Sequence, residues 1–418
     1  KEESIIYTLI KKKILYLFFQ NINMLNKEIK ISRHGTFISK VNIDHNNIFK
    51  ELDLLLKEHI EINWTHLSAE EKRILQDISS SIKDKNVSQS LNLANKNVKI
   101  KFNFSDQELQ WLSKHRKKDW INYIIYRYKF KVYPAIHKET DFPLYLLIEP
   151  TSVCNIRCVM CFQVDESFSK KKEYLGFMDI ELFKKIINDA KENNCQAITL
   201  ASRGEPTLHK QFNEMMKILK KSNILDLKIN TNATVLTEEK SRQILDANFS
   251  EVVFSVDAGT KETYESIRVL GKFERVVQNI KMFKKIRETE FPNSSTITRI
   301  SGVKVNDSQD LIQMSEFWSR YVDEVSIKNA SPRWDSYNNK VNNEINPCLN
   351  LWYRMYIWHD GTTNPCDFDY KSFLSQGSIK TDSISDIWTN DSYKKFRENH
   401  LNKNRKKHTP CDRCPITH

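Results

Sequence analysis

The chain has 418 residues, of which 39% are apolar and 28% charged, and its formal net charge is +12. This composition excludes a disordered chain and allows a core large enough for two or three domains. No run of about 18 apolar residues occurs, so no membrane span is expected. The short basic runs fit solvated surfaces or an anionic substrate; without a nucleic-acid motif, a nucleic-acid partner is not expected.

Residues 1–140 are predicted to form a mainly helical domain without a metal-ligand pattern. Apolar residues between Ile5 and Leu25 fall near helical spacing, with three lysines among them, which favours a docked amphipathic helix over a signal peptide. Ser68 and Glu71 have the spacing of a capping box. The role of this domain stays open, with peptide recognition as one alternative. Helices are expected at Asp44 to Ile60, Ser68 to Ile82 and Asp106 to Tyr128, and a loop at Asn86 to Asn97.

From Pro143 onward, short apolar strands alternate with helical segments. Such alternation predicts a parallel sheet with crossover helices, and the active sites of such sheets lie at the carboxyl ends of the strands. The six expected strands are Leu144 to Ile148, Gln196 to Leu200, Leu227 to Asn230, Glu251 to Val256, Thr296 to Val303 and Glu324 to Ile327.

Three cysteines, Cys154, Cys158 and Cys161, follow the first strand with C-x3-C-x2-C spacing. Three thiolates on one loop, with no fourth cysteine nearby, would leave one iron of a [4Fe–4S] cluster open to a substrate or cofactor. A closed zinc site needs four ligands, and a disulfide framework is not expected in a large chain with few cysteines. Cysteines that serve as metal ligands imply a reducing, cytoplasmic location.

Four further cysteines lie near the C-terminus: Cys348, Cys366, Cys411 and Cys414. The turn signal at Gly361 predicts a hairpin between Tyr353 to Trp358 and Thr362 to Pro365. A hairpin and a terminal cysteine pair can bring four thiolates together around zinc or around a [4Fe–4S] cluster, and the spacing leaves both open. Cys195 precedes an apolar strand and is expected to be buried without a metal role.

The three-cysteine motif, with Phe162 after its last cysteine, resembles the radical S-adenosylmethionine (SAM) superfamily. The resemblance implies an α/β fold, a partial (β/α)6 barrel over residues 141–335. In this family the open iron binds SAM, and reductive cleavage gives a 5′-deoxyadenosyl radical that abstracts hydrogen. The block from Gly361 to Cys414 is similar to the SPASM and twitch domains. This similarity implies an auxiliary [4Fe–4S] cluster in residues 336–418, held by the four C-terminal cysteines.

Several strand ends also resemble the SAM-binding segments of this family. Ser202 to Thr207 is similar to the glycine–glycine–glutamate segment that holds the SAM amino group, with Arg203 in place of the first glycine. Asn232 lies where family members often have Thr-Asn-Gly. The SAM contacts implied by the resemblance are Phe162, Gly204, Glu205, Asn232, Ser255, Asp257, Arg268 and Val303.

The resemblance to twitch enzymes, which include a dehydrogenase of an aminocyclitol alcohol, implies a dehydrogenase-like oxidation of a small polar substrate such as a sugar or cyclitol. Arg333 and Asp335, at the end of the sixth strand, are the candidate substrate residues. The resemblance also implies a flavodoxin- or ferredoxin-type electron donor. Two alternatives stay open: an enzyme that modifies a peptide or protein, and a zinc-stabilised binding protein without redox chemistry.

Overall fold

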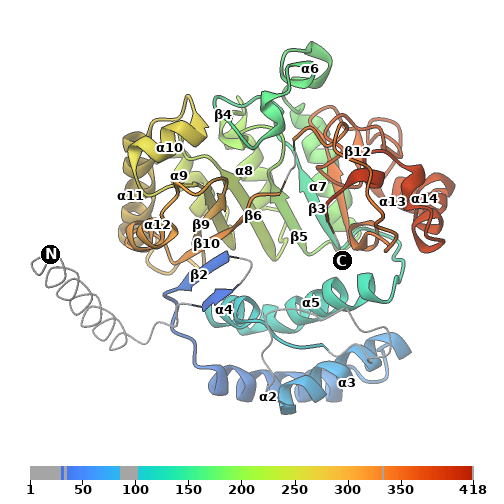
Figure 1. The fold of residues 1–418 in the computed structure, drawn as a ribbon. Helices are drawn as coiled ribbons and strands as arrows, with labels where there is room; N and C mark the ends of the chain where they lie inside the picture. Colours follow the sequence, from blue (N-terminus) through green and yellow to red (C-terminus); the bar gives the residue numbers. More distant parts are fainter. Residues whose placement is uncertain (1–29, 33–34, 85–101, 332–333, 417–418) are drawn as a thin grey trace, which may run out of the picture.

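The structure, a computed structural model, describes residues 30–32, 35–84, 102–331 and 334–416. A ten-stranded sheet forms its centre, with helices along one face, an N-terminal helical layer below and a small C-terminal region at one side (Figure 1). The amphipathic segment Ile5 to Leu25, the loop Asn86 to Asn97 and Arg333 lie outside the described residues.

All six predicted strands are present and form one continuous parallel block. Their order in the sheet is β3, β5, β6, β7, β9, β10, so strands that follow one another in this block are neighbours. Because parallel strands end on the same side, the segments that follow them meet at one edge. The strands are β3 (Tyr145–Ile148), β5 (Ala197–Leu200), β6 (Asp226–Thr231), β7 (Glu251–Ser255), β9 (Ile297–Lys304) and β10 (Glu324–Asn329).

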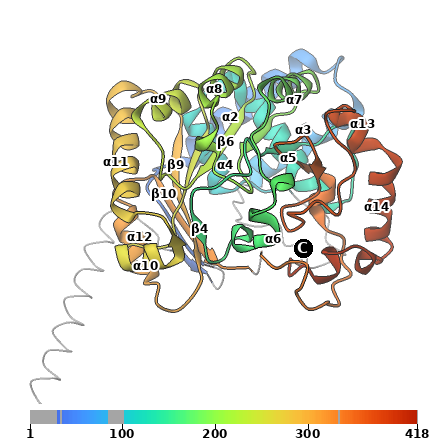
Figure 2. The same ribbon diagram turned by 90° about the horizontal axis from the view of Figure 1, so that it is seen from above.

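Helices pack on the outer face of this sheet (Figure 2). Helix α7 shows why they form where they do: the Asp179 carboxylate accepts hydrogen bonds from two backbone amides of its first turn, and Phe183, Ile186, Ile187 and Ala190 form a buried stripe at helical spacing. The covering helices are α7 (Ile180–Glu192), α8 (Phe212–Lys220), α9 (Glu238–Asp246), α10 (Lys261–Ile267), α11 (Phe273–Glu290) and α12 (Leu311–Trp318).

The N-terminal layer contains α2 (His45–Asn63), α3 (Ala69–Asp84), α4 (Asp106–Lys114) and α5 (Trp120–Ala135). The Ser68–Glu71 capping box at the start of α3 is confirmed. The prediction of a single helix from Asp106 to Tyr128 was wrong, because the chain turns between His115 and Asp119. His115 has an extended backbone, and its carbonyl accepts a hydrogen bond from the Trp120 indole at 3.0 Å, which stabilises the break.

Two further features of the sheet were not expected. The hairpin of β1 (Lys30–Ser32) and β2 (Gly35–Ser39) pairs antiparallel with β10 and extends the sheet at one edge. Helices α4 and α5 lie across the amino ends of the strands (Figure 1), where the Trp111 indole donates to the Ser250 hydroxyl at 3.3 Å. The N-terminal helices therefore close the barrel on the side opposite the strand ends that carry the predicted site.

At the other edge, the C-terminal region also joins the sheet. Strand β11 (Arg354–Ile357) pairs parallel with β3 and forms the predicted hairpin with β12 (Thr363–Asn364). Gly361 has a φ of +84° in this turn, a conformation that favours glycine. Helices α13 (Ile384–Thr389) and α14 (Asp391–Leu401) pack outside the hairpin.

Candidate active site

A cavity of about 430 Å³ lies at the carboxyl ends of the strands, inside the barrel. It brings together residues from the cysteine loop and from the ends of β5, β6, β7 and β9. Arg354, Tyr356 and Asp367 of the C-terminal region close another wall. The predicted residues that line it are Cys154, Cys158, Cys161, Phe162, Gly204, Glu205, Asn232, Ser255, Asp257, Arg268 and Val303.

The cysteine loop is held against the barrel by backbone pairing. Cys158 lies in β4 (Arg157–Cys158), which pairs with β8 (Arg268–Val269), and the Val159 amide donates to the Ile267 carbonyl at 3.0 Å. None of the three cysteines forms a disulfide. Burial raises the pKa of Cys154 to about 12, so the environment alone does not favour a thiolate, whereas a bound metal deprotonates a coordinating thiol.

Gly204 and Glu205 follow β5 and contact this loop. A Cβ atom at Gly204 would lie 2.2 Å from the Thr151 carbonyl oxygen and 2.5 Å from that of Val153, so only glycine fits. Glu205 is 2% exposed, and its carboxylate accepts from the Asn232 backbone amide at 2.6 Å and from the Thr231 hydroxyl at 2.7 Å and makes no ion pair within the described chain. Burial raises its pKa. A buried carboxylate of this kind is complementary to an ammonium group.

Three other predicted residues lie around the cysteines. The Asn232 side-chain amide lies 3.8 Å from the Cys154 sulfur, and an Arg268 Nη1 lies 3.6 Å from the Cys158 sulfur. Arg268 also pairs with Asp257 at 2.7 Å, and Asp257 accepts a hydrogen bond from the Val303 amide at 2.8 Å. These side chains therefore position the cysteine loop, and their contact with SAM stays a prediction.

Phe162 lies at the edge of the cavity and packs into an aromatic cluster. Its ring stacks on Tyr370 at a centroid distance of 5.1 Å and meets Phe168 edge to face at 5.8 Å. Tyr370 belongs to the C-terminal region, so this cluster joins the cysteine loop to that region. Phe162 is 6% exposed, which fits a packing role beside its predicted cofactor contact.

Arg203, which takes the place of a glycine in the family's segment, also joins the barrel to the C-terminal region. Its guanidinium makes two hydrogen bonds of 2.7 Å to the Glu149 carboxylate and donates to the Tyr370 carbonyl at 2.8 Å. His359 contacts the same carboxylate through Nδ1 at 3.1 Å. Although burial opposes ionisation, Arg203 and His359 hold the pKa of Glu149 at about 2.

The structure does not bring Asp335 into the cavity. Its carboxylate accepts from the Asn338 side chain at 2.6 Å in a turn, and its φ is +58°. Arg354, Tyr356 and Asp367 line the cavity instead. The alternation of side chains along the predicted strand Tyr353 to Trp358 places Arg354 and Tyr356 on one face, a signal available from the sequence.

The four C-terminal cysteines come from three segments of the C-terminal region. Cys348 precedes a short 3-10 helix, Cys366 follows β12, and Cys411 and Cys414 flank the last turn. Burial raises the pKa of each thiol, and proximity to Cys348 further raises those of Cys366 and Cys411. Within the described ranges, no three His, Cys, Asp or Glu side chains are arranged around a single ion. Each thiolate of a four-iron cluster binds a different iron, so such a cluster does not require one shared point.

Cys195 is buried beside β5, at 5% exposure.

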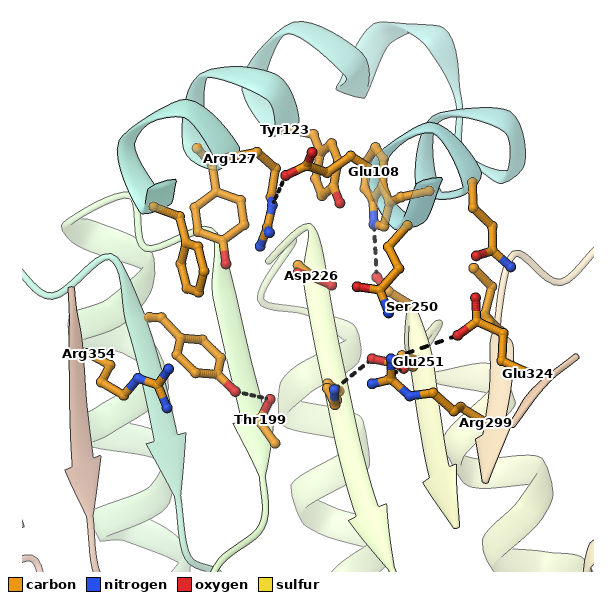
Figure 3. A pocket seen from close by; sticks show the side chains of 18 residues that line it. Glu108, Tyr123, Arg127, Thr199, Asp226, Ser250, Glu251, Arg299, Glu324 and Arg354 are labelled. Atoms are coloured by element: carbon orange, nitrogen blue, oxygen red, sulfur yellow. Dashed lines mark hydrogen bonds and ion pairs between the residues drawn. The ribbon is translucent and has the colours of Figure 1, made fainter. Parts of the chain in front are cut away.

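A second cavity, of about 240 Å³, lies between the N-terminal helices and the amino ends of the strands (Figure 3). Its charges are largely paired, within the N-terminal helices on one side and within the barrel on the other. Glu108 of α4 pairs with Arg127 of α5 at 2.8 Å, and Glu251 pairs with Lys228 at 2.8 Å and with Arg299 at 2.5 Å. Arg354 lines both cavities. This polar layer contains no cysteine and separates the N-terminal helices from the predicted site.

The fold and the site define an iron–sulfur protein whose three-cysteine loop faces a cofactor-sized cavity. Residues 148–317 match the radical SAM superfamily, and residues 348–415 match the SPASM iron–sulfur cluster-binding domain. The chain is a radical SAM enzyme with a C-terminal domain of the SPASM type. Its cofactors are SAM, the SAM-binding [4Fe–4S] cluster and an auxiliary [4Fe–4S] cluster. No helix in the described part of the chain is long and apolar enough to cross a membrane.

Several proteins are similar to this chain. The tungsten-containing aldehyde ferredoxin oxidoreductase cofactor-modifying protein of Pyrococcus furiosus is 28% identical, over 60% of this chain and 83% of its own. The cysteine-type anaerobic sulfatase-maturating enzyme of Clostridium novyi is 24% identical, over 62% of this chain and 83% of its own. The structure of SuiB of Streptococcus suis bound to precursor peptide SuiA matches with a TM-score of 0.53 and 14% identity, over 94% of this chain and 98% of the SuiB chain. The last similarity shows that the fold is shared over nearly the whole chain.

Proposed function

We propose that this enzyme abstracts a hydrogen atom from a carbon of a polar substrate and completes a two-electron oxidation with the auxiliary cluster as electron acceptor. One observation carries the proposal: a single cavity extends from the three-cysteine loop to Asp367, the neighbour of Cys366. When the cofactors are bound, reductive cleavage of SAM supplies the 5′-deoxyadenosyl radical that abstracts the hydrogen.

The wall that faces the cysteine loop is polar. Arg354 Nη1 lies 3.5 Å from the Tyr356 hydroxyl, which lies 3.5 Å from an Asp367 carboxylate oxygen. Arg354 forms no ion pair within 4 Å in the part of the chain that the structure describes, and its Nε is buried without a partner. A few converging polar groups of this kind fix the orientation of a small ligand, and we assign these three residues to the substrate.

This wall provides a group for each particle that the oxidation releases. An alcohol carbon that has lost a hydrogen atom must lose one further proton and one electron to become a carbonyl. The Asp367 carboxylate faces the cavity and is the group we assign to the proton. Cys366, the adjacent residue, belongs to the predicted auxiliary cluster, which is the acceptor we assign to the electron. A sugar or cyclitol alcohol is the substrate class that fits this chemistry.

A peptide or protein is the second candidate substrate. The sulfatase-maturating relative and the fold shared with peptide-bound SuiB favour it. In that case the N-terminal helices would bind part of the peptide. Because α4 and α5 lie at the amino ends of the strands, the peptide would have to pass around the edge of the barrel to reach the cavity. The proposed electron donor is a flavodoxin- or ferredoxin-type protein, and we retain the prediction of a reducing, cytoplasmic location.

The test uses the anaerobically reconstituted full chain with SAM, dithionite and carbon-deuterated cyclitols, sugars or candidate precursor peptides. We expect deuterium in 5′-deoxyadenosine and a product two hydrogen atoms lighter with one of these classes. Deuterium transfer from a peptide would favour the second candidate. SAM cleavage with deuterium transfer but no oxidised product would refute the proposed oxidation.

A further inference from the structure

A buried arginine, Arg405, lies among the backbone segments that carry the C-terminal cysteines. Its side chain is 1% exposed. Nε donates to the Cys411 carbonyl at 3.1 Å, Nη1 to the Asn346 carbonyl at 3.4 Å and Nη2 to the Ile416 carbonyl at 3.2 Å. Asn346 is two residues before Cys348, and Ile416 is two residues after Cys414. One guanidinium therefore ties together the segments of three of the four cysteines.

Among the described residues, the charge of this arginine has no acidic partner. No carboxylate of the described residues lies within 4 Å of the Arg405 guanidinium. A buried cation that meets only carbonyl oxygens is costly unless an anion lies nearby. The guanidinium lies instead beside the backbone of three cysteine segments, whose thiols are the predicted ligands of the auxiliary cluster. Four thiolates on an oxidised four-iron core carry a net charge of about −2.

We propose that Arg405 is the positive counter-charge of the auxiliary cluster and the clip that holds its cysteine segments in place. A cation beside a cluster stabilises the reduced, more negative state and moves its potential to more positive values. The cluster would thereby accept an electron from a substrate radical more readily. This last consequence rests on the proposed oxidation, whereas the counter-charge itself does not.

The test isolates the auxiliary cluster in the full chain by replacing Cys154, Cys158 and Cys161 with alanine. In this background, Arg405→Gln removes the charge and Arg405→Lys keeps it. The readouts are iron and sulfide per chain, iron retained against a chelator, and the midpoint potential from an EPR-monitored titration. We expect Arg405→Gln to weaken iron retention by about 10-fold or more and to make the potential more negative, with Arg405→Lys between the two.

Arg397 supplies the matched control, because it is equally buried in the same region. It donates to the Leu351 and Trp388 carbonyls at 2.9 Å and pairs with Glu139, and none of these three residues lies within two positions of a cysteine. Arg397→Gln is expected to lower stability and leave the potential unchanged. The proposal is overturned if Arg405→Gln keeps the parent's iron and potential, if Arg397→Gln shifts the potential equally, or if the centre is redox-silent.

One outcome needs the lysine variant. If Arg405→Gln binds no iron, recovered iron in Arg405→Lys supports the counter-charge, and an iron content as low as that of Arg405→Gln overturns it. None of these measurements needs a substrate. A failed deuterium transfer would therefore count against the proposed oxidation alone.

Discussion

Replacing Arg203 with methionine tests the buried ion pair of Arg203 and Glu149 inside the barrel, which also contacts Tyr370 and His359 of the C-terminal region. The Arg203 and Glu149 side chains are 2% and 0% exposed and share two hydrogen bonds of 2.7 Å. The pKa of Glu149 falls from 4.5 to about 2, which corresponds to about 3 kcal/mol of stability at neutral pH. Removing one partner of a buried ion pair typically lowers the free energy of unfolding by about 3–5 kcal/mol. The pKa shift and the typical cost of breaking such a pair therefore give the same magnitude.

The pH dependence of this pair has a definite sign. Because the pKa of Glu149 is lowered in the folded state, its stabilisation is complete above pH 4.5 and disappears as the pH falls toward 2. Arg203→Met should remove this pH dependence of stability between pH 4.5 and 2. Adding Glu149→Gln to Arg203→Met should recover part of the lost stability, because no buried carboxylate is then left unpaired.

The assay is urea unfolding of the reconstituted protein, followed through its first transition at pH 7. Arg242→Met is the matched control, because Arg242 makes a similar two-bond pair with Glu290 at an exposed site. No measurable change is expected for the control. The reasoning is refuted if Arg203→Met is no less stable than Arg242→Met, or if the Glu149→Gln addition destabilises further.

Three further predictions concern the site and the barrel interior. Gly204→Ala should lower the iron content by about four per chain while the auxiliary iron stays, because its methyl group would collide with the Thr151 carbonyl; metal analysis with EPR checks this. Asp367→Asn should leave SAM cleavage intact and abolish the oxidised product, measured by mass spectrometry; unchanged product formation would remove Asp367 from the proposed proton transfer. Burial raises the pKa of Glu324 from 4.5 to about 7, so the folded protein loses stability as the pH rises from 4.5 to 7. Glu324→Gln should therefore stabilise the protein at pH 8 and make the thermal unfolding midpoint depend less on pH between 4.5 and 7. A variant with the same pH profile as the parent would contradict the raised pKa.

Local sequence patterns predicted most of the barrel and the candidate metal ligands. The strands could be predicted because each is a short apolar run between turn and helix signals, and the order of a βα alternation fixes which ends meet. The cysteine spacing predicted two ligand groups, since loop residues a few positions apart must lie near one another. Except for Phe162 and Arg268, the predicted SAM contacts lie at the ends of barrel strands, which the βα alternation brings to one side, and all eight predicted contacts line one cavity.

Only the tertiary structure decided how the remaining parts meet. A hydrogen bond from the Trp120 indole to the His115 carbonyl stabilises the break between α4 and α5, and helical periodicity does not reveal such a contact. Arg203 could be aligned with a glycine from sequence, but its partner Glu149 is 54 residues away, and long-range pairs leave no local pattern. Asp335 followed a predicted strand end yet lies in a turn outside the cavity, whereas Arg354 enters it because β11 pairs with β3. The sequence by itself thus predicted the candidate cysteine ligands and the strand ends around them. The pairing of strands distant in sequence decided which polar side chains line the cavity beside those cysteines.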